Sequence, residues 1–137
     1  MPNYLAVYGT LRPQGRSCRA PRLPGARHAG ECLIPGRLFV SYGFPVLKPH
    51  SDTVKGDLFV MPYGFDFTPV DNFEDYYPRA PHKCWYVRRR VQLRCPRVHA
   101  WVYYYVHRPD VRTLVRSGDW VRHCRNGSSG VGSHADR

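Results

Sequence analysis

The chain has 137 residues and a mass of 15.9 kDa, and 42% of its residues are hydrophobic. This length suits one domain with its own core, and a 14% aromatic content argues against disorder. No apolar stretch reaches the roughly 20 residues of a membrane span, and no basic segment followed by an apolar run opens the chain. We therefore expect a soluble cytoplasmic domain over residues 1–125 and a flexible, Gly- and Ser-rich tail over residues 126–137.

Charge is the strongest compositional signal. The chain has 21 Lys and Arg against 10 Asp and Glu, for a formal net charge of +11. Such an excess favours anionic partners such as nucleic acid or nucleotides, although a basic surface can also serve solubility alone. The acids are clustered, because six of the ten lie between Asp52 and Asp75.

The five cysteines, Cys18, Cys32, Cys84, Cys95 and Cys124, contain no C-x-x-C pair. The seven histidines show no metal-ligand spacing either. We expect reduced thiols and no metal site. A nucleophilic Cys–His pair stays open from the sequence alone.

Short β-rich segments dominate the chain. In order, strands are predicted at residues 4–8, 37–40, 54–60, 85–93 and 100–106. In the fourth segment Trp85, Val87, Val91 and Leu93 are predicted to share one face. A short helix is predicted at residues 68–75, with Thr68 as its cap and Pro69 in its first turn. A second helix is predicted to begin near Asp110. Several strands and few helices indicate a mostly antiparallel α+β domain, which could close into a barrel.

Two places carry candidate chemistry. Gly9 ends the first predicted strand, and a glycine there can turn backbone N–H groups toward a carboxylate or phosphate, or form only a turn. Glu74 lies on the apolar side of the predicted helix, with Val70 and Phe73. Partial desolvation would raise the pKa of such a carboxyl and suit it to proton transfer. A surface acid paired with an arginine is the alternative.

A series of motifs resembles the γ-glutamylcyclotransferase-like superfamily, and most closely its γ-glutamylamine cyclotransferase branch. The motifs span about residues 4–120, and in chain order they are Tyr8-Gly9-Thr10-Leu11, Gly36-Arg37-Leu38-Phe39 with Phe44-Pro45, Val54-Lys55-Gly56-Asp57-Leu58-Phe59, Val70-Asp71-Asn72-Phe73-Glu74-Asp75-Tyr76, Tyr86-Val87-Arg88, Ala100-Trp101-Val102-Tyr103 and Ser117-Gly118-Asp119-Trp120. Pro13-Gln14-Gly15 and the Arg- and Pro-rich residues 16–28 depart from the family pattern, next to where the leaving group would lie.

The resemblance implies a small mixed-topology β-barrel of about five to seven strands with a few short helices. It implies that Tyr8, Gly9, Thr10 and Leu11 hold the α-carboxylate and α-amine of a γ-glutamyl substrate. Glu74 would then act as general base and acid while the α-amine attacks the γ-carbonyl, giving 5-oxoproline and a free amine. Tyr86 and Tyr103 would be hydroxyl donors near the γ-carbonyl.

The resemblance requires no metal or cofactor and no membrane partner, and it leaves the oligomeric state open. The competing hypothesis is a non-catalytic or repurposed member of the fold that binds an anionic ligand, nucleotide or nucleic acid. Aromatic residues interleaved with arginines over residues 85–94 would be its contact surface.

Overall fold

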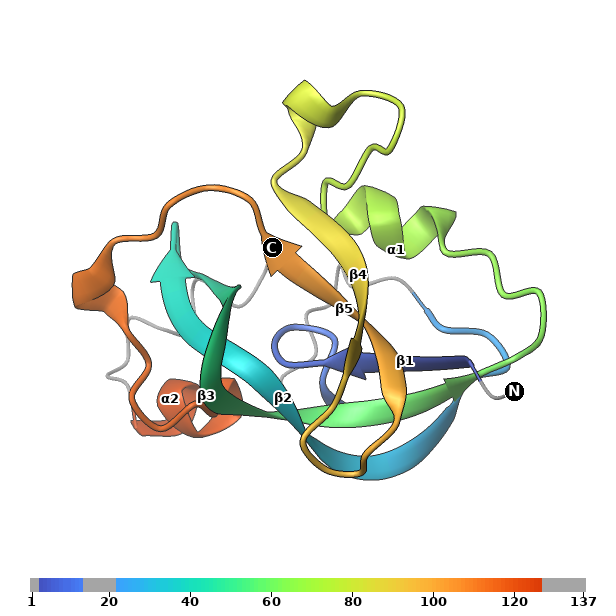
Figure 1. The fold of residues 1–137 in the computed structure, drawn as a ribbon, viewed down its shortest axis with the longest axis horizontal. Coiled ribbons are helices and arrows are strands. Elements are labelled where there is room, and N and C mark those ends of the chain that lie inside the picture. Colours follow the sequence, from blue (N-terminus) through green and yellow to red (C-terminus); the bar gives the residue numbers. More distant parts are fainter. Residues whose placement is uncertain (1–2, 14–21, 127–137) are drawn as a thin grey trace.

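The computed structural model describes residues 3–13 and 22–126, which form one five-stranded sheet with a few short helices (Figure 1). The sheet order is β2-β3-β1-β5-β4, with β1 antiparallel to β3 and parallel to β5. The predicted α+β class and mixed topology are confirmed. The elements are β1 (Asn3–Val7), β2 (Arg27–Ser41), β3 (Phe44–Met61), α1 (Thr68–Phe73), η2 (Pro81–Lys83), β4 (Tyr86–Gln92), β5 (His99–Tyr105), η3 (Val111–Thr113) and α2 (Trp120–Asn126).

The hairpin of β2 and β3 is much longer than the sequence indicates, because its prolines did not end the strands. β1 pairs with β3 only from Asp57 to Met61, so the half of β3 that contains Pro45 is paired with β2. Proline is tolerated where one side of a strand needs no ladder hydrogen bond. Pro35 lies in β2, an edge strand, at a register shift that bends the hairpin.

The closed barrel expected from the sequence is wrong, because the sheet curls without closing. A barrel needs continuous hydrogen bonding between its first and last strands. Among the described residues, the two edges share one isolated bridge, in which the Leu33 N–H donates to the Cys95 carbonyl at 2.8 Å. β4 has only seven residues against fifteen in β2, so the end of the β4–β5 hairpin meets the long edge strand at a single point.

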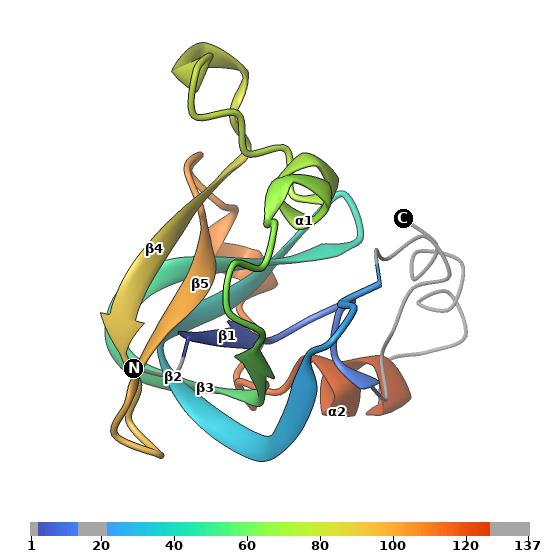
Figure 2. The same ribbon diagram turned by 90° about the vertical axis from the view of Figure 1, so that its right-hand side faces the viewer.

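Both faces of the central strands are buried. Ala6 of β1 and Tyr8 directly after it lie in one apolar cluster, while Leu5 and Val7 of β1 lie in another on the opposite face. Trp120 of α2 packs in the first cluster and Val70 of α1 in the second, with the two helices well apart on different sides of the sheet (Figure 2). This arrangement explains why the first and last predicted strands read as continuous apolar runs.

The helix predicted near Asp110 is reduced to the three residues of η3. The Asp110 carboxylate accepts the Arg112 N–H at 2.9 Å, and the chain then leaves helical geometry. The Val115 N–H donates to the Leu38 carbonyl at 2.8 Å, which binds this segment to β2 and prevents a longer helix. The helix that does form, α2, was not predicted as one.

α2 ends at Asn126, the first residue of the predicted flexible tail, and residues 127–137 lie outside the described part. No helix among the described residues has the length and apolar character needed to cross a membrane.

Candidate active site

Tyr8, Gly9, Thr10 and Leu11, here called the 8–11 loop, leave the middle of the sheet directly after β1. The loop closes with a hydrogen bond of 2.9 Å from the Arg12 N–H to the Gly9 carbonyl. Tyr8, Thr10 and Leu11 are buried. A buried loop between two flanking strands is held in one place, which favours its use as a fixed binding element.

Gly9 is required by close packing. A Cβ atom at this position would lie 2.4 Å from Cγ of Pro45, well inside van der Waals contact. The φ angle of Gly9 is outside the left-handed region, so the requirement is steric only. The two motifs that contain Gly9 and Pro45 therefore meet in space, although 36 positions separate them.

A buried ionic network anchors the end of the loop. The Arg12 guanidinium donates to Asp57 of β3 at 2.7 Å and to Asp119 at 2.9 Å. The side chains of Arg12 and Asp57 are 3% and 1% exposed, and His28 adds a contact of 2.9 Å to Asp57. The network joins three motifs, because Arg12 follows the 8–11 loop and Asp119 precedes α2. Sequence reasoning noted these motifs and did not assign this role to their charged residues.

Glu74 lies at the end of α1, where its N–H donates to the Val70 carbonyl at 3.0 Å. The next residue, Asp75, has a left-handed φ of 50°, so the chain turns away immediately after Glu74. Glu74 is 8% exposed, which excludes the alternative of an exposed surface acid. The helix itself is capped at Phe67 rather than Thr68, and the Asp66 carboxylate accepts the Thr68 N–H.

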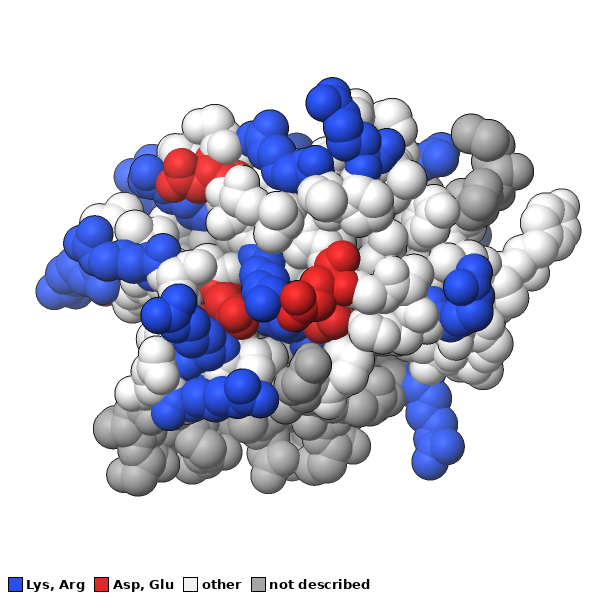
Figure 3. Space-filling view, turned by 90° about the horizontal axis from the view of Figure 1, so that it is seen from below, with Lys and Arg blue, Asp and Glu red and all other residues white. Residues whose placement is uncertain are grey.

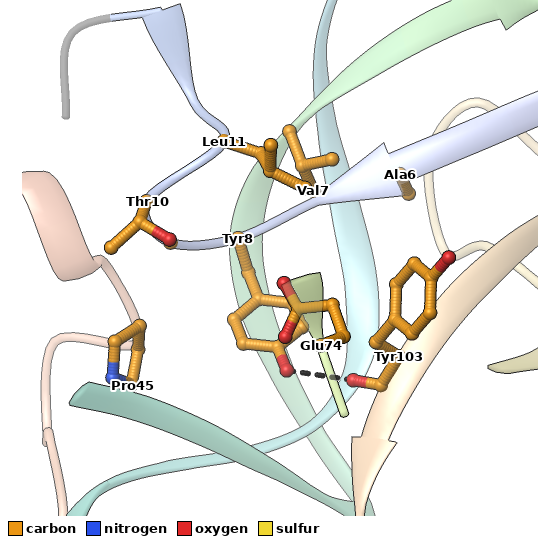
Figure 4. Close-up of a pocket in the computed structure, with 9 residues that line it drawn as sticks. Ala6, Val7, Tyr8, Thr10, Leu11, Pro45, Glu74 and Tyr103 are labelled. Carbon is orange, nitrogen blue, oxygen red and sulfur yellow. Dashed lines mark hydrogen bonds between the residues drawn. The ribbon is translucent and has the colours of Figure 1, made fainter. Parts of the chain in front are cut away.

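Glu74 and the 8–11 loop line one cleft, together with Ala6, Val7, Pro45 and Tyr103. Figure 4 shows the Glu74 carboxylate directed to the side of the cleft on which the loop lies. The cavity volume is about 20 Å³, which is roughly the room that one ordered water needs. The structure thus brings together the two features that the sequence singled out separately.

Asp71, one helical turn before Glu74, is a charged residue of the site that sequence reasoning did not assign. Its carboxylate accepts from the Tyr103 hydroxyl at 2.5 Å and from Arg88 at 2.9 and 3.3 Å. The Arg88 guanidinium also lies over the rings of Phe67 and Trp101, 4.3 and 4.5 Å from their centroids. The sequence did contain a signal for Asp71, because it lies three residues before Glu74 and residues at i and i+3 share a helix face.

The hydroxyl protons of the three candidate tyrosines go to protein acceptors. Tyr8 donates to the Tyr103 carbonyl at 2.7 Å, Tyr103 donates to Asp71, and Tyr86 donates to the Pro45 carbonyl at 2.9 Å. A hydroxyl has one proton to donate, so in this arrangement none of the three directs it at a γ-carbonyl. Burial and the Asp71 carboxylate raise the pKa of Tyr103, which keeps its phenol protonated.

Tyr86 lies outside the lining of the Glu74 cleft. It borders a larger neighbouring groove with Trp85 and Tyr105. Its hydroxyl donates to the backbone carbonyl of Pro45, so Tyr86 contacts the cleft through this wall residue.

The described residues contain no group of three or more His, Cys, Asp or Glu side chains that could hold a metal ion. Cys32, Cys84, Cys95 and Cys124 are free thiols, and Cys18 lies outside the described part. Residues 14–21, half of the stretch that departs from the family pattern, also lie outside it.

Basic side chains are scattered over the face seen in Figure 3, around a few small groups of acids. In the segment 85–94, proposed as a nucleic-acid surface, Tyr86 is buried and Arg88 is engaged with Asp71. Two of the residues proposed for that surface therefore make their contacts inside the protein.

The fold and the cleft define a small α+β protein with a buried carboxylate facing a strand-end loop. Residues 5–122 match the sequence model of the family described as gamma-glutamyl cyclotransferase, AIG2-like. The chain therefore belongs to this family. Membership supports a γ-glutamyl cyclotransferase type of function, with a small-molecule γ-glutamyl substrate.

Solved structures share the fold. The uncharacterized protein PH0828 from Pyrococcus horikoshii is 21% identical, with a TM-score of 0.61 over 92% of this chain and 99% of that one. YkqA from Bacillus subtilis is 19% identical, with a TM-score of 0.61 over 90% of this chain and 41% of that one. The protein ytfP from Escherichia coli is 28% identical, with a TM-score of 0.53 over 85% and 95% of the two chains. No curated protein matches the chain significantly.

Proposed function

We propose that this protein is a γ-glutamyl cyclotransferase of the γ-glutamylamine type, which releases 5-oxoproline and a free amine. The observation that carries the proposal is the buried carboxylate of Glu74 in one cleft with Gly9 and Thr10. The only other glutamate, Glu31, has a side chain that is 56% exposed and bound to Lys55. Burial thus separates Glu74 from an ordinary surface acid.

In the proposed reaction, the 8–11 loop binds the α-carboxylate and α-amine of the γ-glutamyl group. Glu74 takes a proton from the α-amine, whose nitrogen attacks the γ-carbonyl carbon and forms a five-membered ring. The bond from that carbon to the leaving nitrogen then breaks, and Glu74 returns the proton to this nitrogen. Because nucleophile and electrophile belong to one molecule, the protein supplies orientation and a proton relay.

The cleft must widen to admit a γ-glutamyl group, because its present volume is about that of one water molecule. Leu11 and Pro45 in the lining of the cleft are apolar, so the occupied cleft would exclude water from the reacting atoms. Asp71 lies one turn from Glu74 and is neutralised by Arg88, which limits the repulsion between the two carboxylates.

The test is release of 5-oxoproline from γ-glutamylamines by the wild type and by Glu74→Gln. Glutamine keeps the volume and cannot accept the proton, so turnover is expected to fall by about 10²–10⁴-fold while substrate binding is largely retained. Glu31→Gln, the same substitution at the exposed glutamate, is the matched control and is expected to keep wild-type turnover. A folded Glu74→Gln protein with wild-type turnover would show that another group moves the proton.

A wild type that releases 5-oxoproline from no γ-glutamyl donor would refute the proposed function. The repurposed binding protein would then take its place. Its signature is retention on a nucleic-acid column that weakens steeply as the salt concentration rises.

A further inference from the structure

A second, larger hollow lies beside the Glu74 cleft and has no role in the ring closure itself. Its volume is about 490 Å³, within the usual range for small-molecule sites. We call it the aromatic groove, and its defining residues are Tyr42, Phe44, Trp85, Tyr86, Tyr105 and Asp75.

The aromatic groove and the Glu74 cleft are built on the same elements. β3 contributes Pro45 to the cleft and the adjacent Phe44 to the groove, and the end of α1 contributes Glu74 and then Asp75. β5 contributes Tyr103 to the cleft and Tyr105 to the groove. Residues two apart on a strand share a face and are separated by about 7 Å. A substrate held at Glu74 would therefore reach the groove with the next few atoms beyond its γ-carbonyl.

The groove is shaped for a flat apolar group. Trp85 and Tyr42 are 41% and 82% exposed, and their rings meet edge to face with centroids 6.2 Å apart. The centroid of the Tyr105 ring lies 6.3 Å from that of Trp85 and 5.6 Å from that of Tyr86. Exposed rings around a concave apolar surface gain most from contact with another ring.

Charge around the groove favours a neutral occupant over a cationic one. Its acid, Asp75, already accepts the Tyr77 hydroxyl at 2.9 Å. Lys48 donates to the Tyr105 carbonyl at 2.8 Å, and the chain carries a net charge of +11. A leaving amine with a second positive charge would be disfavoured by this net positive charge, and the Asp75 carboxylate in the groove already has a hydrogen-bond partner.

We propose that the aromatic groove binds the leaving amine of the substrate and selects γ-glutamyl amides of arylalkylamines. The inference rests on the proposed function, because it places the γ-carbonyl at Glu74. The aryl ring lies against the exposed surfaces of Trp85 and Tyr42, and the amide nitrogen remains at the boundary with the cleft, where Glu74 protonates it. Selection comes from contact area that a small amine cannot provide.

The experiment compares three substrates: γ-glutamyl-2-phenylethylamide, γ-glutamyl-methylamide and γ-glutamyl-putrescine, whose leaving amine carries a second amino group that is protonated at neutral pH. The wild type is expected to favour the phenylethylamide over the methylamide by about tenfold or more in kcat/KM. Trp85→Ala and, as a second variant on a more exposed ring, Tyr42→Ala should each bring this ratio toward one. Tyr63→Ala is the control, because Tyr63 is fully exposed and outside the groove lining.

Equal kcat/KM for the phenylethylamide and the methylamide would overturn the inference and leave the proposed function standing. A preference for the cationic γ-glutamyl-putrescine would also overturn the inference and leave the proposed function standing. Turnover of none of the three substrates would refute the proposed function, and binding then decides the inference. Titration of the wild type with each amide, followed by Trp fluorescence, should still show tighter binding of the phenylethylamide, and weaker binding in Trp85→Ala. Equal affinities for the two amides would overturn it.

Discussion

The contact between Gly9 and Pro45 can be tested by Gly9→Ala. The added methyl group would lie 2.4 Å from Cγ, 3.3 Å from Cβ and 3.7 Å from Cδ of Pro45. Both residues are buried, so one of them must shift by about 1 Å to restore a carbon–carbon contact of about 3.5 Å. Overpacking of this kind costs about 1–3 kcal/mol.

The cost should appear as stability and as altered binding. In thermal unfolding, about 4 °C is lost per kcal/mol for a domain of this size. Because Gly9 lies in the cleft wall, KM for a γ-glutamyl amide should also rise. The partner variant Pro45→Ala removes the obstructing ring. In the double variant Gly9→Ala/Pro45→Ala, the loss of stability should therefore be smaller than the sum of the losses in the two single variants, by about 1 kcal/mol or more.

Additive losses in this double-mutant cycle would refute the contact. A Gly9→Ala protein with the wild-type melting temperature and KM would refute the close packing itself. Urea unfolding provides an independent value of the free energy.

Three further predictions concern the buried groups. Arg12→Met should lower the free energy of unfolding in urea by about 3–5 kcal/mol, because it leaves buried carboxylates without their partner. Arg112→Met, in an exposed pair, should change it by less than about 0.5 kcal/mol, and equal effects would contradict the network. Burial raises the pKa of Cys32 to about 12, so an alkylating reagent should modify exposed Cys95 in the folded protein and Cys32 only after unfolding, as peptide mass spectrometry can show. Burial alone would raise the pKa of Asp119, but hydrogen bonds from a backbone N–H of α2 and from Arg12 outweigh it and lower the pKa below its ordinary value of 3.8. Its stabilisation is then complete above about pH 4 and is lost as the pH falls through the lower folded value, so Asp119→Asn should flatten the acid side of the stability profile.

The fourth predicted strand shows which features of burial the alternation of apolar residues can predict. Val87, Val91 and Leu93 were predicted to share one apolar face, and all three pack with the first cluster. Tyr86, on the opposite face of the strand, is also buried, because the second cluster covers that side. Trp85, expected with the apolar face, precedes β4 and is 41% exposed. Alternation identifies two faces, but whether both are covered depends on segments distant in the chain.

The sequence by itself determined the positions of the five strands but not the length of the β2–β3 hairpin, together with the short helix before Glu74 and the glycine at the end of β1, because these follow from local periodicity and turn chemistry. It also carried the family's motifs in their order. Only the tertiary structure decided that the sheet stays open, since closure depends on how the long β2–β3 hairpin meets the β4–β5 hairpin. The tertiary structure also decided which side chains pair with Arg12 and with Asp71. Buried charges need opposite charges or hydrogen bonds, but the residues that provide them are brought together only by packing, at sequence separations of up to 107.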